Sequence, residues 1–192
     1  KLGFDDKKYY PLKKIRKKFF LIIGRHNPHK NLGRVIRAFA HAKINNYKLI
    51  FVGPFDKRYT PNLIKLIDKF DIRHLCVWKG WIDDDEKLLL LNECHALIIA
   101  SLWEGFGLPA LEAMACGTPV IASDRGALPE VVGDYAYFIN PLNIQSIACA
   151  MNEVINDKEC FEKAIKEGPS RAKSFNWSNT AKTIEKIIQQ IN

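Results

Sequence analysis

Residues 19–24 read FFLIIG, a short and wholly apolar run, and five more runs of strand length follow it along the chain. Between these runs lie segments with helical spacing of apolar residues, for example Leu32, Val35 and Ile36. Strands that are apolar throughout are buried on both faces, and strands that alternate with helices form parallel sheets. The sequence therefore predicts an α/β fold with strands at 19–24, 48–53, 76–82, 96–101, 119–123 and 136–140.

This pattern predicts one Rossmann-like domain, a doubly wound parallel sheet of about six strands with a helical C-terminal tail. We expect Asn31 to cap the first helix, residues 83–86 (DDDE) to open another, and further helices at 109–115 and 127–132. After Pro141 the pattern is helical from 143 to 192, with a break expected at Gly168-Pro169. The predicted division is a basic lead-in at 1–18 and a domain at 19–192.

Composition narrows the class of protein. The 192 residues are 47% hydrophobic and 26% charged, which excludes collagen-like, low-complexity and disordered chains. No apolar run approaches the roughly 20 residues that span a bilayer, and no signal-peptide core follows the basic start, so we expect a cytoplasmic location. The five cysteines form no CxxC and are odd in number, which indicates neither a disulfide framework nor a zinc site, and we expect no metal.

The net charge of +8 is concentrated at one end, since residues 1–18 account for +6. We favour a solvated lead-in to the first strand. A basic module that binds nucleic acid or an anionic membrane surface is the alternative.

Polar and glycine-rich residues follow the predicted strands, at the sheet edge where ligands bind in this class of fold. The loop GRHNPHKN at 24–31 places Arg25 and Lys30 five residues apart, and two such cations suit a diphosphate. The chain contains neither a GxxxxGK[ST] loop nor a GxGxxG motif after its first strand, so a P-loop nucleotidase and a typical NAD enzyme are not supported.

The stretch SLWEGFGLPALEAMACG at 101–117 carries most of the chemistry. Glycines there let the backbone approach a ligand, and the N–H groups of Gly107, Leu108 and Ala110 would form an anion cradle at a helix start opened by Pro109. Glu104 and Glu112, the latter expected in the first helical turn, are acceptors for sugar hydroxyls. The alternative is a tight turn formed by the glycines, with Glu104 as a surface residue and Glu112 as a residue that stabilises the helix dipole.

These motifs, with TPVIAS at 118–123, LPEVVGD at 128–134 and FNWSNTAKTIEKII at 175–188, resemble the C-terminal, donor-binding domain of retaining group 1 glycosyltransferases with the GT-B fold. The resemblance implies a nucleoside diphosphate sugar as co-substrate and no further cofactor. The catalytic residues that it implies are Arg25 and Lys30, on the diphosphate, and Glu104, on the transferred sugar. The donor-binding residues that it implies are Gly24, Ile82 at the base, Gly105, the backbone of Phe106, Gly107 and Leu108, and Glu112 at the ribose.

Enzymes of this family have a second, N-terminal Rossmann-like domain that this sequence does not contain. We therefore expect the chain to bind a nucleotide sugar but to transfer little sugar alone, with a glycan or lipid-linked acceptor reached through the missing domain. Peripheral contact with the inner face of a membrane is compatible with this function, and nucleic acid is not expected as a partner. Half of a sugar-nucleotide epimerase, or a phosphorylase of the same architecture, is the alternative enzyme.

Overall fold

A computed structural model describes residues 4–5 and 7–191 of the chain, without the side chains of Cys160, Asn179 and Ile191. Lys1, Asp6 and Asn192, which belong to our predicted segments, lie outside the described residues. The elements in chain order are β1 (Phe19–Ile23), η1 (Pro28–Lys30), α1 (Leu32–Ala42), β2 (Lys48–Val52), α2 (Thr60–Lys69), η2 (Arg73–Leu75), β3 (Cys76–Lys79), α3 (Asp84–Glu93), β4 (Ala96–Ile99), α4 (Leu108–Ala115), β5 (Val120–Ser123), α5 (Leu128–Val132), η3 (Gly133–Tyr135), β6 (Ala136–Ile139), α6 (Ile144–Asn156), α7 (Lys158–Lys173) and α8 (Trp177–Ile191).

The strands form one parallel sheet in the order β3-β2-β1-β4-β5-β6, which confirms the predicted doubly wound fold. β1 is central: it pairs with β2 along its length and with β4 through Phe20 and Leu21. β3 is shorter than predicted, because the chain leaves the sheet after Lys79. The strand order reverses between β1 and β4, and this switch point is where such sheets bind ligands.

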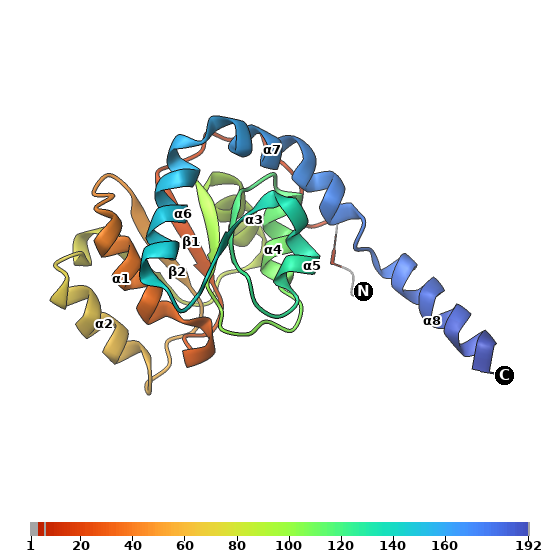
Figure 1. Cartoon of the computed structure of the whole chain (residues 1–192), viewed down its shortest axis with the longest axis horizontal. Helices are drawn as coiled ribbons and strands as arrows, with labels where there is room; N and C mark the ends of the chain where they lie inside the picture. The colour runs from red at the N-terminus through yellow and green to blue at the C-terminus, as the bar shows by residue number, and fades with distance from the viewer. Residues whose placement is uncertain (1–3, 6, 192) are drawn as a thin grey trace.

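Helices cover both faces of the sheet (Figure 1). α1, α2 and α6 pack on one face, around Phe20, Ile36 and Phe51. α3, α4, α5 and the end of α7 pack on the other, around Leu21 and Leu97. Because successive residues of a strand face opposite helical layers, the strands are apolar at most positions rather than at every second one.

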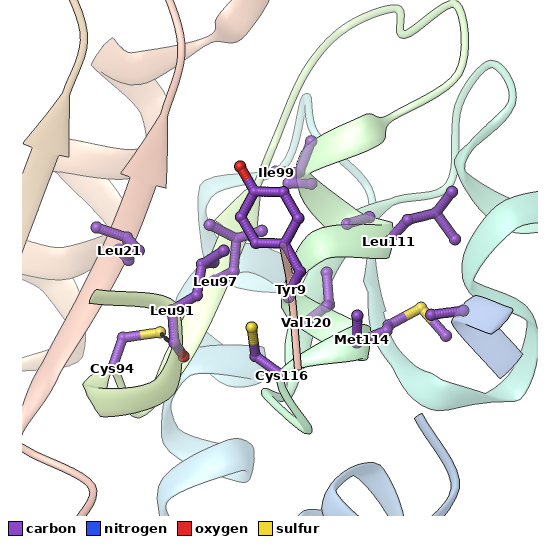
Figure 2. Packing of buried hydrophobic residues seen from close by; sticks show 14 of the residues in the cluster. Tyr9, Leu21, Leu91, Cys94, Leu97, Ile99, Leu111, Met114, Cys116 and Val120 are labelled. Atoms are coloured by element: carbon purple, nitrogen blue, oxygen red, sulfur yellow. Dashed lines mark hydrogen bonds between the residues drawn. The ribbon is translucent and has the colours of Figure 1, made fainter. Parts of the chain in front are cut away.

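The N-terminal segment is only partly the solvated lead-in that we expected: most of its described residues are exposed, but some of its side chains pack in the second of these layers. Phe4 and Tyr9 are each 6% exposed and pack in the cluster of α3 and α4, and Figure 2 shows Tyr9 among its labelled residues. The Leu12 N–H donates to Asn92 of α3 at 2.6 Å. Lys17 pairs with Glu93 at 2.6 Å. The segment therefore lies as a strap along α3.

The C-terminal tail is helical as predicted, but α7 continues through Gly168 and Pro169 without the expected break. α7 packs closely against α4 at this point: a Cβ on Gly168 would lie 3.0 Å from the Met114 carbonyl oxygen, a tight contact that glycine avoids. The break comes instead after Lys173, and α8 extends away from the body of the molecule (Figure 1). Within the described part of the chain, no helix has the length and apolar character to cross a bilayer.

Candidate functional site

The candidate site lies at the carboxyl edge of β1, β2 and β3, where a pocket of about 270 Å³ opens. The residues that line it are Ile23, Gly24, Arg25, Val52, Gly53, Pro54, Gly80, Trp81, Ile82, Asp84 and Lys87. Gly24, Arg25 and Ile82 are therefore together, as the sequence predicted. Arg25 is exposed, and no described carboxylate pairs with it.

Two glycines set the floor of this pocket. Gly53 has a φ of +147°, and a Cβ at that position would lie 2.0 Å from the Gly24 carbonyl oxygen. The loops after β1 and β2 can pass this closely only because residue 53 has no side chain.

Lys30 folds back over the pocket wall and meets Glu104. Its Cε lies 3.2 Å from where a Cβ of Gly24 would stand, and its Nζ lies 3.0 Å from both Glu104 carboxylate oxygens. Both side chains are mostly buried, at 19% and 13% exposed. The ammonium has three donors, so one remains for a further acceptor.

Asn31 fixes the loop that carries Lys30. It occupies the predicted cap position before α1, but its side chain makes no capping bond there. Its amide instead donates to the carbonyl oxygens of Ala100, at 3.0 Å, and Pro141, at 2.7 Å. The loop after β1 is thereby tied to the end of β4, across the switch point.

The loop from Glu104 to Leu108 forms the other side of the site. Gly107 has a φ of +91°, and its missing Cβ leaves room for Leu128, whose Cδ2 would otherwise lie 2.7 Å away. The N–H groups of Phe106, Gly107 and Leu108 have no hydrogen-bond partner among the described residues. The Ala110 N–H, which we predicted for the same cradle, donates to the Gly107 carbonyl oxygen at 2.9 Å. Three backbone donors at the start of α4 thus remain open for an anion.

Neighbouring glycines hold this loop in place. A Cβ on Gly126 would lie 2.5 Å from the Glu104 carbonyl oxygen, and the Ala127 N–H donates to that oxygen at 3.1 Å. Gly105 packs beneath the ring of Trp103, which is 67% exposed. Glu104 is therefore fixed through its backbone as well as through Lys30.

Glu112 lies deeper than the other predicted site residues. It falls in the second turn of α4 rather than in the first, because the helix already begins at Leu108. It is 8% exposed and pairs with Lys87 of α3 at 2.7 Å. Burial raises the pKa of its carboxyl group, and Lys87 opposes that rise. Glu112 does not line the pocket itself; it connects to it through Lys87.

A larger open groove, of about 510 Å³, lies between the first turns of α1 and α2. It is lined on one side by His26 and Asn27, which follow Arg25. We place the site in the smaller pocket because Gly24, which lines it, adjoins Lys30, and the partner of Lys30, Glu104, directly precedes the open backbone donors. In the described part of the chain, no three His, Cys, Asp or Glu side chains gather where they could hold a metal ion.

The structure adds Lys87 to the predicted site residues. The sequence placed Gly53 and Gly126 at this edge of the sheet, but the close contacts that require glycine there were not predicted. The two glycines carried a signal, since each follows shortly after a buried strand. Lys87 carried none, because its partner Glu112 is 25 residues away on another helix.

Comparison with known proteins agrees with this geometry. The model of the family "Glycosyl transferases group 1" matches residues 5–171. The O-antigen chain mannosyltransferase B of Escherichia coli is 31% identical over 170 residues, which cover 86% of this chain and 44% of that protein. The chain covers only 20% of another E. coli relative, the serotype-specific mannosyltransferase WbdA.

Solved structures show the same fold. The C-terminal domain of LpcC, a glycosyl transferase group 1 family protein from Francisella tularensis, superposes with a TM-score of 0.79 and 26% identity, covering 90% of this chain and 97% of that domain. Anabaena HepE, solved with UDP and glucose, superposes with a TM-score of 0.87 at 22% identity, covering 97% of this chain and 55% of that protein.

Proposed function

The chain belongs to the group 1 glycosyl transferases, and from this we propose that it is the donor-binding half of a retaining enzyme that transfers a hexosyl-type group from a nucleoside diphosphate sugar to a glycan or lipid-linked acceptor. The observation that carries the proposal is the arrangement of three groups at the carboxyl edge of the sheet. Arg25 lines the pocket, the Lys30–Glu104 pair adjoins Gly24 of the pocket wall, and the open N–H groups of residues 106–108 follow Glu104.

The charges suit the reaction. In the transfer, the bond between the sugar C1 and the diphosphate oxygen breaks, C1 bonds to the acceptor oxygen, and the proton of the acceptor hydroxyl leaves with the nucleoside diphosphate. Negative charge therefore develops on the leaving diphosphate. Arg25, the free donor of Lys30 and the three backbone N–H groups would stabilise that charge without reorganisation. The Glu104 carboxylate would accept a hydrogen bond from a hydroxyl of the transferred sugar. The Glu112 carboxylate would accept hydrogen bonds from the ribose hydroxyls.

The relatives support the same substrate class. The E. coli proteins are named mannosyltransferases, which favours a hexosyl donor, and HepE was solved with UDP and glucose. Gly24, Gly105 and Ile82 would contact the donor through their backbones, with the base near Ile82 and Trp81 at the pocket mouth. The acceptor would bind a further domain, so we expect donor binding by this chain with little or no transfer.

Calorimetric titration of the chain with UDP-, GDP- and ADP-sugars tests the proposal. We expect one nucleotide class to bind and the Arg25→Ala/Lys30→Ala variant to lose at least about tenfold in affinity, because charge-assisted contacts to phosphate are lost. An Arg58→Ala variant is the control, since Arg58 pairs with Asp56 and does not line the pocket. Absence of binding by the native chain, or equal binding by the double variant, would contradict the assignment.

A basic module for nucleic acid or an anionic membrane remains the second candidate, on the observation that the N-terminal segment is rich in lysine. Several of its charges are used within the domain, since Lys8 pairs with Asp84 and Lys17 with Glu93. Replacing Lys13 and Lys14 by Glu would abolish salt-dependent binding to DNA or anionic vesicles if this second function were right. An epimerase would be recognised by its product, an epimerised nucleotide sugar without a new glycosidic bond.

A further inference from the structure

We propose that Lys87 is a positioning residue for the nucleotide: it lines the donor pocket and holds the Glu112 carboxylate, which lies behind it, in place and ionised. The inference rests on the proposed function, because it assigns to Glu112 the ribose hydroxyls of a nucleoside diphosphate sugar. It adds a residue that lies outside the sequence motifs, on α3.

Lys87 lies between the pocket and Glu112. It is one of the pocket-lining residues, and its Nζ is 2.7 Å from the Glu112 carboxylate. The two side chains are 20% and 11% exposed, so their pairing is shielded from bulk water. Both carboxylate oxygens of Glu112 lie 2.7 Å from this Nζ, and the buried Oε2 has no hydrogen bond of good geometry within the described chain. The position and charge of this carboxylate therefore depend on Lys87.

The strap fixes the lysine from its other side. The Nζ of Lys87 stands 5.0 Å from the centre of the Tyr9 ring, a cation–π contact. The Tyr9 hydroxyl donates to Asp84 at 3.2 Å, and Asp84 also accepts from Lys8 at 2.7 Å. Lys87 therefore lies between an aromatic face and a carboxylate, which limits the positions that its ammonium can take.

Among the described residues, the charged or titratable groups that face Glu112 come from three elements. Lys87 and Asp84 face it from α3, Tyr9 from the strap and Cys116 from the end of its own helix. Lys87 is the cation of this set. Without it, a buried carboxyl group beside Asp84 would take up a proton more readily, and a protonated carboxyl group is a weaker acceptor for ribose hydroxyls.

The test is calorimetric titration with the nucleoside diphosphate that binds the native chain, at a series of pH values, because burial raises the pKa of the Glu112 carboxyl group. We expect Lys87→Met to bind about tenfold more weakly at the low end of the series and to recover affinity as the pH rises. Lys87→Arg should keep the pairing and stay within about threefold of the native affinity. Lys79→Met is the matched control, because Lys79 pairs with Glu86 of the same helix and lies outside the pocket.

A double-mutant comparison separates positioning from direct contact. If Lys87 acts through Glu112, the Lys87→Met/Glu112→Gln variant binds as Glu112→Gln alone and has the same flat pH profile. Additive losses would overturn the proposal, because they would mean that Lys87 contacts the nucleotide itself. Thermal unfolding verifies that each variant is folded, and Lys87→Gln replaces Lys87→Met if the latter is not.

The two proposals fail in different ways. A native chain that binds no nucleoside diphosphate overturns the proposed function and this inference with it. A native chain that binds, with Lys87→Met equal to it at every pH, overturns only the role of Lys87.

Discussion

Arg16 and Arg25 stand at opposite edges of the same sheet and have opposite surroundings. Arg16 precedes β1, and its guanidinium donates to the carbonyl oxygens of Leu91, Cys94, Cys116 and Gly117 and to the Thr118 hydroxyl. Arg25 follows β1, is exposed and has no ion-pair partner among the described residues. At the amino edge, Arg16 satisfies acceptors at the C-terminal ends of α3 and α4. At the carboxyl edge, Arg25 remains available to a ligand.

Two histidines repeat the contrast. His95 precedes β4, and its Nε2 lies 3.1 Å from the Val154 carbonyl oxygen. His26 follows β1; its Nδ1 lies 2.8 Å from the Thr60 hydroxyl, but its buried Nε2 has no partner within the described chain. In these two pairs, the polar groups at the amino edge are satisfied by the protein, and those at the carboxyl edge are not. A ligand is expected at the carboxyl edge, because polar groups there lack partners within the protein.

The largest expected effect is the loss of Arg16. Arg16→Met would leave five acceptors at the ends of α3 and α4 without their donor, and we expect the free energy of unfolding to fall by about 4 kcal/mol. Urea denaturation measures this change. Arg25→Met is the matched control and should stay within about 0.5 kcal/mol of the native chain. Equal effects of the two substitutions would remove the contrast between the edges.

A smaller loss of stability is expected from a substitution at the close contact between the loops that follow β1 and β2. Gly53→Ala places a methyl group 2.0 Å from the Gly24 carbonyl oxygen at a φ of +147°, so we expect a loss of about 2 kcal/mol together with weaker nucleotide binding. Gly80, in the neighbouring loop, is the control for stability: a Cβ there would meet no atom within 4 Å, so Gly80→Ala should leave the free energy of unfolding nearly unchanged. Denaturation of both variants and calorimetry on Gly53→Ala check this, and a neutral Gly53→Ala would show that the two loops can separate at no cost.

The smallest effect is on the pH dependence of stability. Burial lowers the pKa of His26 and of His95 below the ordinary value of 6.5. The unfolded chain then binds protons more readily than the folded one, so this contribution to stability is complete above about pH 6.5. It declines as the pH falls below that value.

The contrast between the edges predicts that His26 and His95 contribute unequally to this loss of stability at low pH. A protonated His95 keeps an acceptor in Val154, whereas a protonated His26 gains none at Nε2, so His26→Gln should flatten the profile more than His95→Gln. Denaturation at a series of pH values distinguishes them. A larger effect at His95 would contradict the proposed difference between the edges.

Local patterns were enough to predict the sheet and the edge that holds the site. The apolar runs and the glycines after them depend on neighbours in the sequence, and strands β1 to β6 fall within the predicted ranges. Features decided by distant contacts were not predictable in this way. Tyr9 is buried because it packs against α3 and α4. α7 continues past Pro169, where Gly168 packs closely against α4. Lys87 was missed for the same reason.

The central position of β1 has a consequence for how the chain folds. β1, β2 and β3 are contiguous in the sequence and can associate before the second half of the chain is available, whereas β4 must join the other side of β1 afterwards. Lys30 comes from the first half and Glu104 from the second, so the pair exists only once the halves have docked. A bound nucleotide would therefore report completed folding, and added ligand should favour the finished sheet over a half-formed intermediate.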